Sequence, residues 1–154
     1  MTQLKEGDKA PVFSGINQDG EKVTLADYQG KKLVLFFYPK DNTPTCTVEV
    51  CNLRDNYELL QERGFELLGV SADSERKHQN FISKYNLPFP LLSDKDHTVL
   101  NQYGVYGPKK MFGRLLNGIY RTTFVIDEQG GIEKVITDVK AKSHTQQILE
   151  AVEV

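Results

Sequence analysis

The sequence predicts an α/β protein in which helices flank a mixed central sheet and a β-hairpin precedes that sheet. The apolar run at residues 33–38 is typical of a buried strand, within a strand expected at residues 32–38, and residues 65–71 predict a second central strand. Each of these segments is followed by a stretch in which apolar residues recur at helical spacing, and a second hairpin pattern and a final helix close the chain. Helices that alternate with strands in this order pack on the faces of a sheet.

The N-terminal residues predict the additional hairpin. A short strand can begin at residues 12–13, Asp19-Gly20 is a hairpin-turn signal, and residues 21–25 alternate as a returning strand. One short helical turn is expected at residues 25–30, before the first buried strand.

A long helix is expected from about residue 43 to residue 63, with Gly64 as its stop. Its core face consists of apolar residues at helical spacing, namely Val50, Leu53, Tyr57 and Leu60. The remaining expected elements are strands at residues 65–71, 89–93, 120–127 and 132–137, helices at residues 74–85, 96–103 and 143–152, and a glycine-rich loop at residues 104–118.

The chain of 154 residues is long enough for one domain with its own core, and a single domain is expected over residues 1–154. Hydrophobic residues make up 39% and charged residues 26% of the chain, values typical of a globular protein. The formal net charge is −2 without a basic block, which argues against nucleic acid as a partner. No apolar run is long enough to span a membrane, and the first residues lack the apolar core of a signal peptide. A cytoplasmic location is therefore expected.

Two cysteines in a cytoplasmic protein are more typical of catalysis or metal binding than of a permanent disulfide. Their spacing is wider than that of a zinc-binding pair, and the three histidines, His78, His97 and His144, are scattered along the chain. We therefore expect no metal site and no cofactor, and the histidines are assigned no role.

The segment around Cys46 predicts a reactive thiolate. Thr43 is the expected N-cap of the long helix, and Pro44 suits its first position. Cys46 then occupies the third helical position, where free backbone N–H groups and the helix dipole stabilise an anion. A cysteine in that position is biased towards the thiolate, which is its nucleophilic form.

Cys51 lies five residues after Cys46. In an intact α-helix this spacing gives about 7.5 Å of rise and about 140° of rotation, so the two Cα atoms lie roughly 8.7 Å apart. A disulfide tolerates a separation of at most about 7 Å. The two sulfur atoms can therefore bond only if the first turns of the helix unwind, which predicts two states of this segment.

The same segment resembles the active site of a known family. The pattern Pro39-xxx-Thr43-xx-Cys46 is similar to that of peroxiredoxins, and residues 38–51 resemble the bacterioferritin comigratory protein (PrxQ) branch. The chain departs from that branch at Thr45, where Gly is usual. The resemblance extends over most of the chain and implies a thioredoxin-like fold, in which the N-terminal hairpin is the peroxiredoxin addition.

The resemblance implies a thiol-dependent peroxidase that reduces hydrogen peroxide and organic hydroperoxides. Cys46 is the implied peroxidatic cysteine. Cys51 is the implied resolving cysteine, which forms an intramolecular disulfide with the sulfenic acid of Cys46 after the helix unwinds. Thioredoxin or a similar dithiol protein is the implied reductant, and the branch implies a monomer.

Negative charge spreads over both oxygens when a thiolate cleaves an O–O bond, and fixed donors stabilise that charge. The Thr43 hydroxyl and a guanidinium are candidate donors. Spacing alone leaves five arginines open, namely Arg54, Arg63, Arg76, Arg114 and Arg121. Residues 118–127 resemble the family segment that carries the catalytic arginine, which assigns this role to Arg121. The resemblance also implies that Glu49 helps to position an arginine.

Two functions are alternatives to the peroxidase: a different enzyme and a binding module. A thiol–disulfide oxidoreductase would carry a C-x-x-C pair, whereas this chain has C-x-x-x-x-C. A non-catalytic thioredoxin-like binding module would lack one of Thr43, Cys46 or Arg121, and all three are present. The residues leave open which peroxide is preferred.

Overall fold

The structure is a computed structural model that describes residues 2–152. The strands are β1 (Ser14–Asn17), β2 (Lys22–Thr24), β3 (Lys32–Phe37), β4 (Phe65–Ser71), β5 (Leu91–Ser93), β6 (Tyr106–Met111), β7 (Arg114–Ile119), β8 (Thr122–Ile126) and β9 (Ile132–Ile136). The α-helices are α1 (Pro44–Asp55), α2 (Tyr57–Glu62), α3 (Glu75–Tyr85), α4 (Thr98–Gln102) and α5 (His144–Val152), and short 3-10 helices cover Leu25–Tyr28 and Ala141–Ser143. No helix within residues 2–152 combines the length and the apolar character that crossing a membrane requires.

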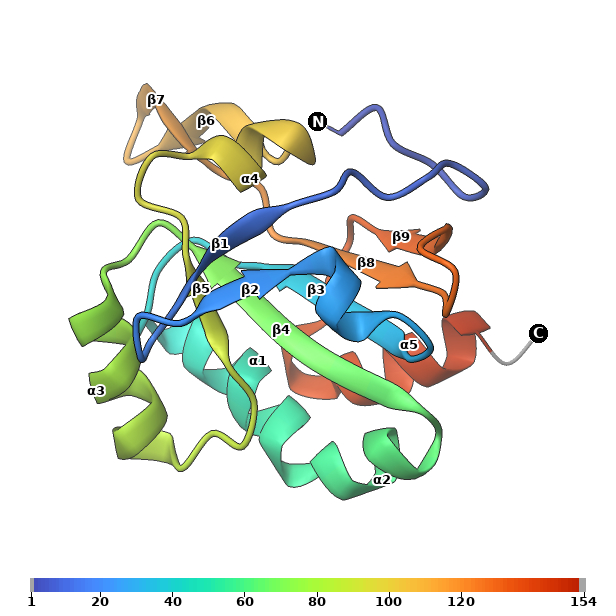
Figure 1. The fold of residues 1–154 in the computed structure, drawn as a ribbon. Helices are drawn as coiled ribbons and strands as arrows, with labels where there is room; N and C mark the ends of the chain where they lie inside the picture. The colour runs from blue at the N-terminus through green and yellow to red at the C-terminus, as the bar shows by residue number, and fades with distance from the viewer. Residues whose placement is uncertain (1, 153–154) are drawn as a thin grey trace.

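Seven of these strands form the predicted mixed sheet, in the order β2-β1-β5-β4-β3-β8-β9 (Figure 1). The central strands β3, β4 and β5 are parallel. The β1–β2 hairpin joins one side through an antiparallel β1–β5 pair, and β8 and β9 extend the other side antiparallel to β3. The N-terminal hairpin therefore extends the main sheet, and its first strand begins at Ser14, slightly later than expected.

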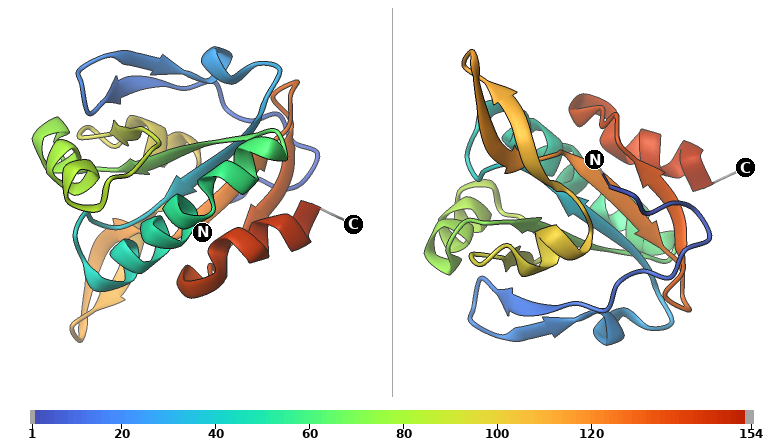
Figure 2. Two further views of the ribbon diagram at one scale, coloured as in Figure 1. Left: turned by 90° about the horizontal axis from the view of Figure 1, so that it is seen from below. Right: turned by 90° about the horizontal axis from the view of Figure 1, so that it is seen from above.

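Each face of the sheet carries a hydrophobic core. Successive residues of β3 point to opposite faces, so Leu33, Leu35 and Phe37 belong to one core and Val34 and Phe36 to the other. Helix α4 and the N-terminal segment cover the first core, whereas α1, α2, α3 and α5 cover the second (Figures 1 and 2). Both faces of β3 are buried from Leu33 onwards, which explains why its sequence is apolar without interruption from that residue.

The long helix expected at residues 43–63 is interrupted at Asn56, which separates α1 from α2. The Asn56 side chain donates to the carbonyl of Asn52 at 2.8 Å and so occupies the acceptor that its own backbone N–H would use in a continuous helix. Its backbone N–H donates to Leu53 instead. The core face is observed as expected, with Val50, Leu53 and Leu60 buried.

The prediction of a loop at residues 104–118 is wrong, because most of these residues form the two-stranded hairpin β6–β7. The hairpin turns at Phe112 and Gly113, which both have positive φ angles, of 53° and 73°. Two consecutive residues of this kind form the tight turn that suits the twist of antiparallel strands. Phe is unusual at such a position and Pro108 is unusual within a strand, so the pattern did not indicate a hairpin.

Candidate active site

Helix α1 begins where the sequence predicts. Thr43 has extended backbone angles, with φ −92° and ψ 156°, and Pro44 is the first helical residue. Cys46 is therefore the third residue of the helix, and only 1% of it is exposed. It packs in the second hydrophobic core together with Val50 of the next turn. The thiol thus lies in a buried setting at the positive end of a helix dipole.

Arg121 contacts both Cys46 and Glu49. It directly precedes β8, where Thr122 lies opposite Phe37 at the end of β3, and the chain leaves β3 towards α1. Its Nη2 atom lies 3.2 Å from the Cys46 Sγ atom, and its Nη1 atom donates to Glu49 Oε1 at 2.5 Å. The sheet register therefore places a guanidinium next to the thiol, and the carboxylate one turn further along α1 holds that guanidinium in place.

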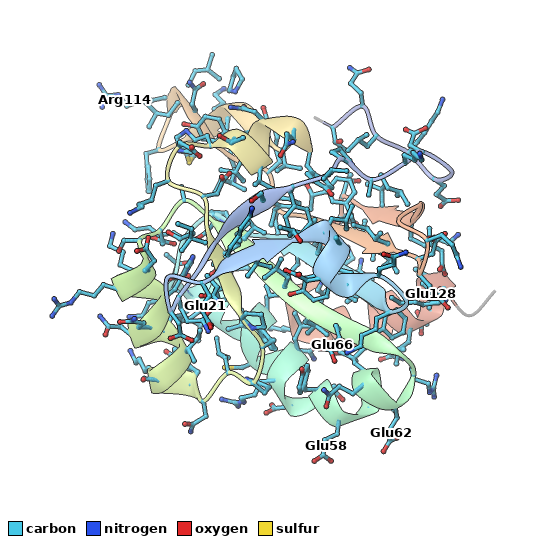
Figure 3. The ribbon with its side chains drawn as sticks, viewed as in Figure 1. Glu21, Glu58, Glu62, Glu66, Arg114 and Glu128 are labelled. Atoms are coloured by element: carbon cyan, nitrogen blue, oxygen red, sulfur yellow. The ribbon has the colours of Figure 1, made fainter. Side chains whose placement is uncertain are left out.

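Two other candidate arginines lie elsewhere. Arg54 pairs with the neighbouring Asp55 at 2.9 Å and donates to the carbonyl of Tyr85. Arg114 is exposed and projects from the tip of the β6–β7 hairpin (Figure 3). Spacing left five arginines open. The structure places next to Cys46 the one that the resemblance selected, Arg121.

Burial and charge oppose one another at this site. Burial raises the pKa of Glu49 to about 7, although the Arg121 guanidinium lowers it. Burial lowers the pKa of Arg121, but the nearby Cys46 and Glu49 outweigh this effect and raise it overall. Lys109 of β6 also faces the site: burial and then Arg121 lower its pKa, and Cys46 raises it. The thiol therefore has two cationic side chains nearby.

Thr43 is the N-cap residue of α1, as expected, but among residues 2–152 its side chain makes no capping hydrogen bond. Its hydroxyl donates to the carbonyl of Lys40 at 2.8 Å. The O–H donor of Thr43 is thus occupied by the Lys40 carbonyl. Its oxygen remains in the loop directly before α1, three residues from Cys46.

Cys51 lies in the same helix, is half-buried, and is a free thiol, as is Cys46. The helix is continuous between them. An intact helix separates their Cα atoms by roughly 8.7 Å, too far for a disulfide. The structure therefore shows the state in which the helix is folded and the cysteines are not bonded.

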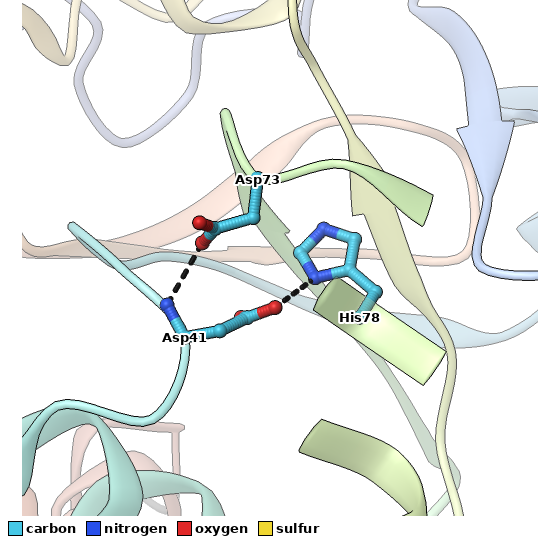
Figure 4. A group of neighbouring side chains, drawn as sticks. All are labelled: Asp41, Asp73 and His78. Atoms are coloured by element: carbon cyan, nitrogen blue, oxygen red, sulfur yellow. Dashed lines mark hydrogen bonds and ion pairs between the residues drawn. The ribbon is translucent and has the colours of Figure 1, made fainter. Parts of the chain in front are cut away.

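The loop before α1 is held by a buried cluster that the sequence did not indicate (Figure 4). Asp41 Oδ2 lies 2.6 Å from His78 Nδ1, and the backbone N–H of Asp41 donates to Asp73 Oδ2 at 2.8 Å. Tyr38 donates to the other oxygen of Asp41, and His78 Nε2 lies 3.0 Å from the carbonyl of Leu92. Asp41, Asp73 and His78 each offer one atom that could bind a metal ion, and these three atoms lie within 4.8 Å of one another. The hydrogen bonds that Asp41 makes with Asp73 and His78 account for their closeness. The cluster fixes the loop that leads to Cys46.

His144, also without an assigned role, lies behind Glu49. It is fully buried at the start of α5, and its Nε2 atom is 3.7 Å from Glu49 Oε2 and 2.8 Å from the hydroxyl of Thr123. Glu49, Thr123 and His144 come from α1, β8 and α5. No local motif could have related three residues from such distant segments.

Comparisons with known proteins agree with this geometry. A family profile described as the AhpC/TSA family matches residues 6–135. A protein named putative peroxiredoxin bcp from Coxiella burnetii is 49% identical over 146 residues, which cover 95% of this chain and 97% of that protein. A crystal structure of a mutant PrxQ from Xylella fastidiosa has a TM-score of 0.91 at 30% identity and covers 99% of this chain and 98% of the other. A structure of the Xanthomonas campestris bacterioferritin comigratory protein, described in terms of its alkyl peroxide reduction activity, has a TM-score of 0.85 at 33% identity and covers 92% and 90% of the two chains.

These likenesses extend over nearly the full length of the chain. They confirm the predicted thioredoxin-like α/β fold and the predicted resemblance.

Proposed function

Because this chain belongs to the AhpC/TSA family and is a thiol peroxidase of the peroxiredoxin type, we propose that Cys46 is its peroxidatic cysteine and that Arg121 stabilises the transition state. One observation carries this assignment. The Arg121 guanidinium lies 3.2 Å from the buried Cys46 sulfur and is held there by Glu49. A peroxide that reaches the sulfur therefore meets a fixed cation at the point where negative charge develops.

The reaction cleaves the O–O bond of a hydroperoxide. The Cys46 thiolate attacks one oxygen, the S–O bond forms as the O–O bond breaks, and the second oxygen leaves with the bonding electron pair. That oxygen takes up one proton and departs as water or alcohol, and Cys46 becomes a sulfenic acid. Arg121 can donate to both the thiolate and the peroxide, because its planar fork carries several N–H groups and stays charged. The Thr43 hydroxyl is proposed as a second contact of the peroxide at the mouth of the site.

We propose Cys51 as the resolving cysteine. Its thiol attacks the sulfenic acid, the disulfide forms and water leaves, once the first turns of α1 have unwound. A dithiol protein of the thioredoxin type then reduces the disulfide. We also propose the cytoplasm as the location, because such a reducing compartment keeps thiols free. We further propose that residues 1–154 act as a single domain and as a monomer, and that hydrogen peroxide and organic hydroperoxides are both substrates.

The first test is the intact mass of the protein before and after one equivalent of hydrogen peroxide, with thiols counted in parallel. We expect the loss of two hydrogens and of both thiols without a dimer, because Cys46 and Cys51 form one disulfide within the chain. Cys46→Ser should keep its mass and its remaining thiol under the same conditions. If Cys46→Ser reacted as fast as the wild type, the assignment of Cys46 would be wrong.

The unwinding should be confined to the first half of α1. Asn52 accepts from the backbone N–H of Thr145 at 2.8 Å and donates to the carbonyl of Lys142 at 3.0 Å, so α1 is tied at that residue to α5 and to the 3-10 helix that precedes it. After oxidation we expect faster hydrogen exchange in residues 44–51 and unchanged protection in residues 57–62. Unchanged exchange in residues 44–51 of the oxidised protein would show that the disulfide forms without unwinding.

A further inference from the structure

The Glu49 carboxylate is buried with one oxygen unpaired. Oε1 accepts from Arg121, but within the described part of the chain Oε2 finds no hydrogen-bond partner. A buried carboxylate oxygen without a partner is costly. The nearest polar ring atom is His144 Nε2 at 3.7 Å, and both side chains are fully buried.

The surroundings of His144 determine which of its ring nitrogens carries the proton. The backbone N–H of Lys140 donates to Gln147 Oε1 at 2.9 Å, and Gln147 Nε2 donates to the carbonyl of Asp138. Gln147 Oε1 is therefore an acceptor. His144 Nδ1 lies 2.9 Å from that oxygen and must donate to it. In the neutral ring, Nε2 then carries only a lone pair, which accepts from the Thr123 hydroxyl and faces Glu49.

A lone pair on His144 Nε2 and an ionised Glu49 oxygen repel each other, whereas a single proton between the two atoms removes this repulsion and gives Glu49 Oε2 a partner. We propose that His144 is a positioning residue of the peroxidase site, and that it shares one proton with Glu49 and thereby sets the orientation and effective charge of Arg121 beside Cys46. This proposal rests on the functions proposed above for Cys46 and Arg121.

The proton changes the charge that Arg121 must balance. With Glu49 ionised, Arg121 lies between two anions, Glu49 and the Cys46 thiolate. With the proton present, it faces the thiolate alone. Lys109 is the other cationic group at the site, and its position does not depend on this proton.

The pKa directions place this change near neutral pH. Burial raises the pKa of Glu49 to about 7. Burial, and then the Arg121 charge, lowers the pKa of His144 to about 4, although the contact with Gln147 raises it. The shared proton therefore resides mainly on Glu49, and it is bound as the pH falls through about 7. Below that pH the guanidinium charge is available to the thiolate.

Two substitutions at one position test the proposal. His144→Asn keeps an N–H donor for Gln147 but has no atom at the Nε2 position. His144→Gln places an amide there, which can donate to Glu49 but cannot titrate. We expect kcat/KM for hydrogen peroxide to fall by about tenfold in His144→Asn, because a buried contact to a charged group is lost. We expect His144→Gln to stay within about threefold of the wild type, because its amide keeps a contact to Glu49.

The pH profile is the readout that packing alone would not change. In the wild type, kcat/KM should show an inflection near pH 7 that comes from Glu49. That inflection should be absent from Glu49→Gln and displaced by about one unit in both His144 variants. Gln146→Ala, an exposed substitution on the same helix, is the matched control and should leave the profile unchanged. If His144→Asn fails to fold, His144→Gln and Glu49→Gln decide the question.

Two results would overturn the proposal. One is a wild-type rate and pH profile in His144→Asn, and the other is an equal loss in both His144 variants with the inflection unmoved. Cys46→Ser separates this failure from that of the proposed function. An inactive Cys46→Ser with an unaltered His144→Asn removes only the role of His144, whereas an active Cys46→Ser removes the assignment of the nucleophile itself.

Discussion

Replacing Arg121 by Gln is expected to lower kcat/KM for hydrogen peroxide by about 10² to 10³, the cost of removing one donor that faces developing charge in a transition state. The effect should be this large because Arg121 contacts the sulfur at 3.2 Å, and Glu49 restricts it to that orientation. Arg121→Lys should recover part of the activity, since a lysine keeps the charge but cannot contact Glu49 and Cys46 through one planar group. Stopped-flow measurement of the peroxide reaction under single-turnover conditions gives the rate without a contribution from the reductant.

Two controls separate this effect from simple damage. Arg114→Gln removes an exposed charge at the hairpin tip and should react at the wild-type rate. Alkylation of Cys46 with iodoacetamide reports the thiolate without an O–O bond to cleave, so Arg121→Gln should slow it far less than the peroxide reaction. Equal losses in the two reactions would mean that Arg121 acts only on thiol ionisation.

The parts of this fold that follow from local pattern were predictable from the sequence. β4 occupies the expected residues because it is a mostly apolar segment that follows the helix stop at Gly64. The start of α1 was predictable because Thr43 suits the N-cap and Pro44 the first helical position, and this placed Cys46 at the third helical position. The β6–β7 hairpin was missed, because its turn relies on Phe112 with a positive φ angle, which no turn rule anticipates.

Which residues form the site depends on tertiary structure and could not be predicted from local sequence patterns. Arg121 reaches Cys46 because β8 pairs with β3 in one particular register, and spacing alone left that arginine among five candidates. Resemblance to a family selected it. His78 and His144 had no motif to indicate them, because their partners Asp41 and Glu49 lie 37 and 95 residues away along the chain (78 − 41 = 37 and 144 − 49 = 95). Such pairs become visible only when burial and distance are known.

Replacing Cys51 by Ser is expected to stop steady-state turnover with thioredoxin while leaving the first reaction with peroxide intact. Cys46 and Arg121 are unchanged in this variant, so one equivalent of peroxide should be consumed in a burst at the wild-type rate. The sulfenic acid then has no partner thiol in the chain, and the steady-state rate should fall by at least about 100-fold. Burst kinetics followed by intact mass should show a gain of one oxygen, and dimedone should trap the product.

The matched comparison is with Cys46→Ser, which should show neither burst nor turnover. Continued turnover of Cys51→Ser would mean that the reductant attacks the sulfenic acid directly, and the unwinding of α1 would then have no part in catalysis. Loss of the burst as well would place Cys51 in the peroxide reaction itself. Cys51 is half-buried on α1 and its sulfur makes no bond with Cys46 while the helix is intact, which favours the expected result, a burst without turnover. Turnover then requires α1 to unfold and refold once for every peroxide reduced, and the ties from Asn52 to α5 and to the 3-10 helix that precedes it keep the rest of the fold in place meanwhile.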